Sequence, residues 1–309
     1  MGETTRSYPA YLALYESGEL RVRATQALRL LSPCRLCPRG CRLDRLSDER
    51  GECHVGRLAL VSSHGPHFGE EPVLRGRRGS GTVFFAGCNL HCVYCQNYDI
   101  SQLVVGRLVS ASELSRIFLE VQDAGCHNLN LVTPTHVVPQ ILEALVLAIG
   151  QGFSLPLVYN TSSYDSLLAL RLLDGVVDIY MPDVKYADAE LGFKYSTVRS
   201  YDRVVRRTVK EMHRQTGDLR IDGNGVARRG LLIRHLVLPN DLSGTRRVLE
   251  FIARELSPGS YVNLMAQYRP AYKAFQYPEL SRPPSYEEFS AAARHAIKVG
   301  IHRGIPFSQ

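Results

Sequence analysis

From residue 82 onward, short β-rich apolar runs alternate with helical segments, and this alternation limits the fold more than any other feature of the sequence. It is typical of β–α units, whose strands lie parallel in one sheet. The predicted strands are 82–87, 129–133, 156–160, 175–181, 230–238 and 260–266. The predicted helices are 111–124, 137–149, 164–173, 201–216, 243–256 and 285–299. We therefore expect a parallel barrel or an open α/β sheet that binds its ligand at the carboxyl ends of the strands.

The part before this alternation has a different composition. After a helical stretch at 11–31, Cys, Pro, Gly and Arg dominate, and "GRRGSGT" at 76–82 marks a boundary. We expect a small, irregular, Cys-rich N-terminal segment over 1–80 and an α/β domain over 81–309.

Composition excludes some classes of function. With 45% apolar and 22% charged residues, the chain is typical of soluble globular proteins. It has neither an apolar run as long as a membrane span nor a signal-peptide core at its start, so we expect a cytoplasmic protein with no membrane partner. The formal net charge of +7 suits an acidic partner or an anionic substrate. No Lys/Arg run is interleaved with aromatics, so nucleic acid is not expected.

Three cysteines, Cys88, Cys92 and Cys95, crowd into "GCNLHCVYCQN" directly after the first predicted strand. Structural zinc needs four ligands, and His91 would have to supply the fourth from an awkward position. A disulfide is disfavoured in a reducing compartment. An iron–sulfur cluster held by three thiolates keeps one iron free for a small molecule.

Together with its place after a strand, this Cys-x3-Cys-x2-Cys spacing resembles the radical S-adenosylmethionine (SAM) superfamily, and most of the chain resembles its pyruvate formate-lyase activating enzyme-like (PflX-like) branch. The resemblance implies a partial (β/α)6 barrel, a [4Fe–4S] cluster on the three thiolates, and SAM bound to the open iron. It also implies an enzyme that cleaves SAM reductively and abstracts hydrogen from a substrate C–H bond.

The resemblance assigns SAM-binding roles to polar residues that follow the strands. In "MPDVKY", Asp183 would take the SAM ammonium group and Lys185 its carboxylate. Tyr94 would pack against adenine. The segment "VTPTH" stands where the family has glycines, so contact there would use Thr133 and Thr135 as well as backbone. The remaining candidates are Asn160, Ser162, His235 and Gln267.

A second cysteine set, Cys34, Cys37, Cys41 and Cys53, lies in "CRLCPRGCRLDRLSDERGEC". Four thiolates in so short a window make a closed site, either structural zinc or an auxiliary [4Fe–4S] cluster. The sequence does not separate the two metals. Either would stabilise a segment that has little apolar core of its own.

The eighth cysteine, Cys126, belongs to neither set. It is either a small buried apolar side chain or a catalytic hydrogen-atom donor that returns hydrogen to the opposite face of a substrate radical. Its position before a strand argues against the second role. In that case a tyrosine such as Tyr180, or a cysteine outside the Cys88–Cys95 loop, would be the hydrogen-atom donor.

Two functions fit the resemblance. One is inversion of a sugar carbon, as in the radical SAM epimerases of orthosomycin (avilamycin-type) antibiotic biosynthesis, with an oligosaccharide or other small-molecule substrate. The alternative is activation of a glycyl-radical enzyme. We expect the first, with a flavodoxin- or ferredoxin-type reductant, since opposite charges steer such encounters.

Overall fold

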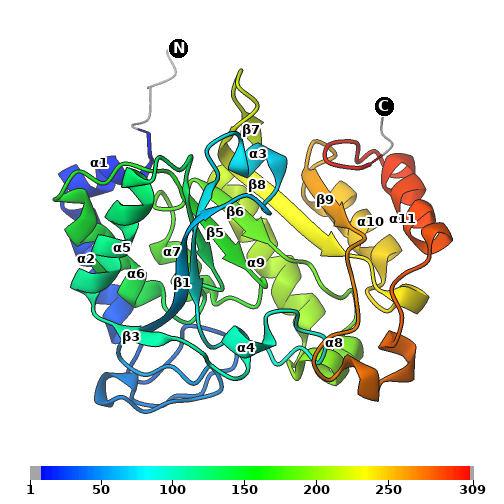
Figure 1. Ribbon diagram of the computed structural model, residues 1–309, viewed down its shortest axis with the longest axis horizontal. Helices are drawn as coiled ribbons and strands as arrows, with labels where there is room; N and C mark the ends of the chain where they lie inside the picture. Colours follow the sequence, from blue (N-terminus) through cyan, green and yellow to red (C-terminus); the bar gives the residue numbers. More distant parts are fainter. Residues whose placement is uncertain (1–7, 307–309) are drawn as a thin grey trace.

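The computed structural model describes residues 8–306 and shows one curved sheet flanked by helices (Figure 1). The strands β2 (Ser80–Phe85), β4 (Leu129–Val132), β5 (Leu157–Thr161), β6 (Ile179–Pro182), β8 (Ala227–Leu236) and β9 (Tyr261–Met265) pair in this order, and all run parallel. The predicted α/β class is confirmed, and the sheet is that of a partial barrel.

The helices that follow these strands cover the outer face of the sheet. They are α5 (Ala111–Asp123), α6 (Val138–Ile149), α7 (Leu167–Leu172), α9 (Tyr201–Thr216), α10 (Thr245–Glu255) and α11 (Tyr286–Lys298). Each lies within three residues of its predicted bounds. Helix α5 shows why: the Ser110 side chain accepts from Glu113 N–H while Glu113 reaches back to Ser110 N–H, which caps the first turn. Four apolar side chains on one face of this helix are then buried against the core, Leu114, Ile117, Phe118 and Val121.

One sheet edge was not expected from the sequence. Strand β1 (Ala59–His67) pairs antiparallel with β2, and β3 (Arg107–Val109) pairs antiparallel with β1. The N-terminal segment therefore contributes a strand to the main sheet, with helices α1 (Tyr11–Glu16) and α2 (Glu19–Arg29) packed beside α6. The short helix α3 (Pro72–Arg75) and strand β7 (Arg220–Ile221) lie together at the top of Figure 1, and β7 pairs antiparallel with β8.

Loops from distant parts of the chain meet at the carboxyl ends of the parallel strands. Helices α4 (Tyr98–Ser101) and α8 (Ala189–Ser196) lie at this end, together with the Cys-rich segment, which is the blue loop at the lower left of Figure 1. Backbone bonds join them, because His91 N donates to Ser196 O (3.1 Å) and Val93 N to Tyr195 O (2.9 Å). The three-cysteine loop is thus fixed between α4 and α8.

Candidate active site at the carboxyl ends of the strands

The loop between β2 and α4 holds Cys88, Cys92 and Cys95, and each thiol has a polar neighbour. Leu90 N donates to Cys88 Sγ (3.3 Å). The hydroxyl of Ser196 lies 3.0 Å from Cys92 Sγ, and that of Ser101 lies 3.1 Å from Cys95 Sγ. Donors in these positions suit thiolates, whose charge they stabilise.

Burial raises the pKa of Cys88, and raises that of Cys92 to about 11. The other cysteines of the loop raise both pKa values further, because thiolates this close repel one another. Three thiolates together therefore require a cationic group that binds them. The donor set fits an iron–sulfur cluster held by Cys88, Cys92 and Cys95.

A cavity of about 790 Å³ opens beside these thiols. Its walls come from the cysteine loop and from the carboxyl ends of β6, β8 and β9. The lining residues are Cys92, Tyr94, Cys95, Gln96, Asn97, Asp183, Lys185, Arg234, Leu236, Met265 and Gln267. The cavity therefore brings thiols, charged groups and an aromatic side chain together in one place.

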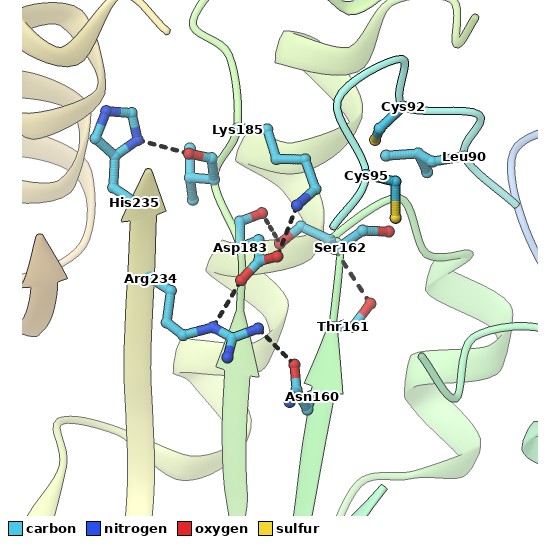
Figure 2. Close-up of polar contacts among 12 residues, drawn as sticks. Leu90, Cys92, Cys95, Asn160, Thr161, Ser162, Asp183, Lys185, Arg234 and His235 are labelled. Atoms are coloured by element: carbon cyan, nitrogen blue, oxygen red, sulfur yellow. Dashed lines mark hydrogen bonds and ion pairs between the residues drawn. The ribbon is translucent and has the colours of Figure 1, made fainter. Parts of the chain in front are cut away.

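A charged network forms the wall opposite the thiols (Figure 2). Lys185 Nζ donates to Asp183 Oδ2 and Arg234 Nε donates to Asp183 Oδ1, both at 2.7 Å. Arg234 Nη2 donates to Asn160 Oδ1, also at 2.7 Å. Burial favours the neutral carboxyl, yet Arg234 and Lys185 hold the pKa of Asp183 below its ordinary value. Asp183 is therefore an anion shared by two cations, and the Arg234 side chain fixes Asn160.

The predicted residue His235 does not reach the cavity. Its Nδ1 donates to Val184 O (2.6 Å) and its Nε2 accepts from the Thr245 hydroxyl (2.9 Å). Its side chain is fully buried, and burial lowers its pKa to about 4. His235 thus joins β8 to the segment after β6 and to the first residue of α10, while its neighbour Arg234, which the sequence did not single out, reaches the cavity.

The remaining predicted residues divide into two groups. Tyr94 and Gln267 line the cavity with the cysteines, and the Tyr94 ring packs edge-on against Tyr186 and Tyr268. Thr135 is buried, with its hydroxyl 3.0 Å from that of Thr161. Thr133, Thr135 and Ser162 do not line the cavity.

Thr133 and Ser162 nevertheless lie just beyond the ends of β4 and β5. Thr133 has a left-handed backbone (φ 60°), and its N–H donates to Asn160 O. The Ser162 hydroxyl oxygen is buried and has no hydrogen-bond partner among residues 8–306. A ligand hydrogen bond to this oxygen would satisfy it.

The structure does not bring Cys126 to the site. A Cβ built on Gly81, near the start of β2, would lie 3.1 Å from Cys126 Cβ, so Cys126 lies at the amino ends of the strands. Tyr180 is also turned away, because its hydroxyl donates to Gln215 in α9 (2.6 Å).

The second set of thiols lines a cavity of its own. Cys34, Cys37, Cys41 and Cys53 line one small cavity together with Arg45, Asn89 and His136. Burial raises the pKa of the Cys37 thiol to about 12. No group of three or more His, Cys, Asp or Glu side chains in the described part of the chain is arranged to hold a single metal ion. We therefore treat the four thiols as one group because they line the same cavity.

The sequence of this domain matches a known family. Residues 82–218, which include the cysteine loop and strands β4 to β6, match the family model described as the radical SAM superfamily. Over 292 residues the chain is 33% identical to the uncharacterized protein MJ0674 of Methanocaldococcus jannaschii, covering 91% of this chain and 79% of that protein. The chain belongs to the radical SAM superfamily.

Membership in this superfamily implies an enzyme whose cofactors are a [4Fe–4S] cluster and SAM. A solved structure of TYW1 with a lysine–pyruvate adduct bound aligns with a TM-score of 0.41 and 9% identity, over 70% of this chain and 73% of that one. This likeness is too weak to support an inference. None of the helices within residues 8–306 is long and apolar enough to cross a membrane.

Proposed function

We propose that this radical SAM protein inverts the configuration of one carbon of a sugar in an oligosaccharide. The observation that supports a small-molecule reaction is the cavity in which the thiols of Cys92 and Cys95 share walls with Asp183, Lys185 and Arg234. Cys88, Cys92 and Cys95 would hold the cluster. When bound, the cluster and SAM would supply one-electron cleavage of a C–S bond and abstraction of a hydrogen atom from a substrate C–H bond.

The charged wall would position SAM. Asp183 keeps its charge beside Arg234 and Lys185 and still has free lone pairs, so it can accept a hydrogen bond from the SAM ammonium group. Lys185 carries further N–H donors for the SAM carboxylate. Arg234 orients Asp183 and Asn160 through the hydrogen bonds that it donates to both side chains. Holding the reactants in one geometry is the main contribution that such a site makes to rate.

The aromatic side of the cavity would exclude water. Tyr94, buried against Tyr186 and Tyr268, presents a rigid apolar surface beside the cysteines. Excluding solvent from the site prevents side reactions of the reactive intermediates and strengthens the charge interactions around them. The substrate would enter on the exposed side, where Gln96 and Gln267 lie.

Epimerisation also needs a hydrogen-atom donor on the opposite face of the substrate carbon. The donor gives one hydrogen atom to the carbon radical and becomes a radical itself, so it must recover one electron from the reductant and one proton from solvent. Cys126 was the candidate from sequence, but it lies at the far end of the strands. We therefore expect Cys126→Ala to give the full yield of the epimer, which would exclude Cys126 as the hydrogen-atom donor.

The experiment uses anaerobically reconstituted protein with SAM, reductant and candidate oligosaccharides in D2O. The expected products are 5′-deoxyadenosine and an epimer with solvent deuterium on one sugar carbon, with Cys92→Ala as the inactive control. Formation of 5′-deoxyadenosine only when a glycyl-radical enzyme is added would instead support the activase, and no epimer from any saccharide would count against the proposal.

The proposal includes two further components. One is a second metal, zinc or an iron–sulfur cluster, bound by Cys34, Cys37, Cys41 and Cys53. The other is an acidic flavodoxin- or ferredoxin-type reductant, which the net charge of +7 would attract. Added salt should then slow turnover driven by flavodoxin but not turnover driven by a small chemical reductant; equal salt responses would contradict this pairing.

A further inference from the structure

Arg45 is buried beside the second set of thiols without a carboxylate partner. Its side chain is 2% exposed, and it forms no ion pair in the described part of the chain. Its Nη1 donates to His136 O (2.9 Å), and its Nε and Nη2 donate to Gly56 O (3.2 and 3.0 Å). An arginine stays charged when buried, and such a charge is costly unless an anion lies nearby.

A thiol of the second set lies within reach of this guanidinium. Arg45 Nη1 lies 3.9 Å from Cys34 Sγ, and both residues line the four-thiol cavity. With four neutral thiols, the nearby anion would be the exposed Asp48 carboxylate, whose pKa Arg45 helps to lower without forming an ion pair. Four thiolates around a divalent ion or a cluster carry a net negative charge, which would balance the guanidinium charge.

Two more buried polar atoms on these walls lack partners. His136 Nε2 donates to Ala86 O (3.0 Å), which makes Nδ1 an acceptor, and this Nδ1 has no partner among residues 8–306. Asn89 Oδ1 is likewise unpartnered, although Asn89 Nδ2 donates to Tyr164 O (2.7 Å). Buried polar groups are rarely left unsatisfied in a complete site. Both atoms are acceptors, which a centre held by thiolates cannot satisfy, so Arg45 and the four thiols alone indicate a bound group.

The same walls contact the cysteine loop of the first site. Asn89 is part of that loop, and its carbonyl accepts from Arg39 Nε (2.9 Å). His91 Nε2 lies 3.0 Å from Glu52 Oε2, which precedes Cys53. A Cβ on Gly87, where φ is +80°, would lie 2.2 Å from Cys53 O, so the two segments pack directly against each other.

We propose that Cys34, Cys37, Cys41 and Cys53 bind one anionic metal centre whose counter-cation is Arg45, and that this centre fixes the position of the loop carrying Cys88, Cys92 and Cys95. The proposal deepens the second-metal part of the proposed function, and its coupling half rests on a cluster at the first site. Loss of the second metal would remove the anionic centre beside Arg45 and release the Cys53 side of the loop contact.

The binding half is tested in Cys88→Ala/Cys92→Ala/Cys95→Ala protein, which keeps only the second set. After anaerobic reconstitution with iron and sulfide, or with zinc, metal and sulfide are counted per chain. One bound zinc, or iron with equal sulfide, supports the proposal and identifies the metal. Less than a tenth of a centre per folded chain would overturn it. This assay does not depend on SAM cleavage, so it stands apart from the proposed function.

The role of Arg45 is tested in the same background with Arg45→Lys and Arg45→Met, both checked for folding by circular dichroism. The lysine variant keeps the charge and should retain metal, whereas the methionine variant should lose at least tenfold in metal affinity. Equal affinity in the two variants would overturn the counter-cation assignment. If the methionine variant does not fold, Arg45→Gln replaces it.

The coupling is tested with Cys41→Ser in the otherwise intact chain, with Cys126→Ser as the matched control. Cys41→Ser should reduce iron at the first site at least several-fold and broaden the EPR signal of its reduced cluster, whereas the control should retain both. An unchanged first-site signal in Cys41→Ser would overturn the coupling while leaving SAM chemistry intact.

Discussion

Replacing Asp183 with Asn removes the anion that Lys185 and Arg234 share. Both cations donate to it at 2.7 Å, and each of the three side chains is less than a fifth exposed. Breaking a buried ion pair by removing one partner costs about 3–5 kcal/mol, because the remaining charge stays buried. For a protein of this size, about 1 kcal/mol corresponds to roughly 2 °C in Tm. We therefore expect Tm to fall by about 6–10 °C.

Differential scanning calorimetry on protein without SAM measures this shift. Glu255→Gln is the control, because Glu255 also pairs with two cations, Arg206 and Lys210, but at an exposed position, and should shift Tm by less than about 2 °C. Adding Lys185→Met to Asp183→Asn should restore part of the lost stability, since it removes one unpaired cation. A fall in Tm no larger for Asp183→Asn than for Glu255→Gln would refute the reasoning.

Three other predictions follow from the geometry. Burial raises the pKa of Asp178 to about 6, so the folded state holds this proton more tightly than the unfolded chain does. Stability to urea should therefore fall by up to about 3 kcal/mol as pH rises from about 4 to 6, and Asp178→Asn should lose that slope; an identical slope in the variant would contradict it. Gly87→Ala should lower Tm and first-site iron content more than Gly125→Ala, because both glycines have a left-handed φ but only Gly87 would clash, and equal effects would contradict the close approach. Cys126→Ala should give the wild-type epimer yield, measured by chromatography, since its thiol lies at the amino ends of the strands; 5′-deoxyadenosine without the epimer would instead identify Cys126 as the hydrogen-atom donor.

The regular part of the fold could be predicted because local signals and packing agree. Apolar runs marked the parallel strands, and capping signals such as Ser110 with Glu113 marked helix starts. The prediction for β6 began too early, at 175, because Val176 and Val177 are buried in the turn after α7 rather than in the strand. Burial alone does not distinguish a buried turn from a buried strand.

Strand β1 escaped prediction for a different reason. Its sequence, "ALVSSHGPH", contains Gly65 and Pro66 and buries only its first three residues. Strand β3 pairs only with Ala59–Val61, so Pro66 lies where β1 has a free edge and its missing N–H costs no bond there. Pairing with β2, which no local signal reveals, stabilises the strand.

Part of the site was also within reach of sequence. Asp183 and Lys185 follow a strand with spacing that puts both on one side, and the structure joins them in one ion pair. The choice of His235 over Arg234 could not be decided, because adjacent strand residues face opposite sides and the sequence does not say which side is inside. Arg45 gave no signal at all, since its burial depends on carbonyls from distant segments.

The central claim is that Cys88, Cys92 and Cys95 hold a cluster beside a cavity that binds SAM. The most direct measurement is 5′-deoxyadenosine formation by anaerobically reconstituted, strongly reduced protein with SAM, compared with the three single Cys→Ala variants. We predict multiple equivalents per wild-type chain and none from any variant. Absence of the product from the iron-loaded wild type, or its persistence in a variant, would contradict the account.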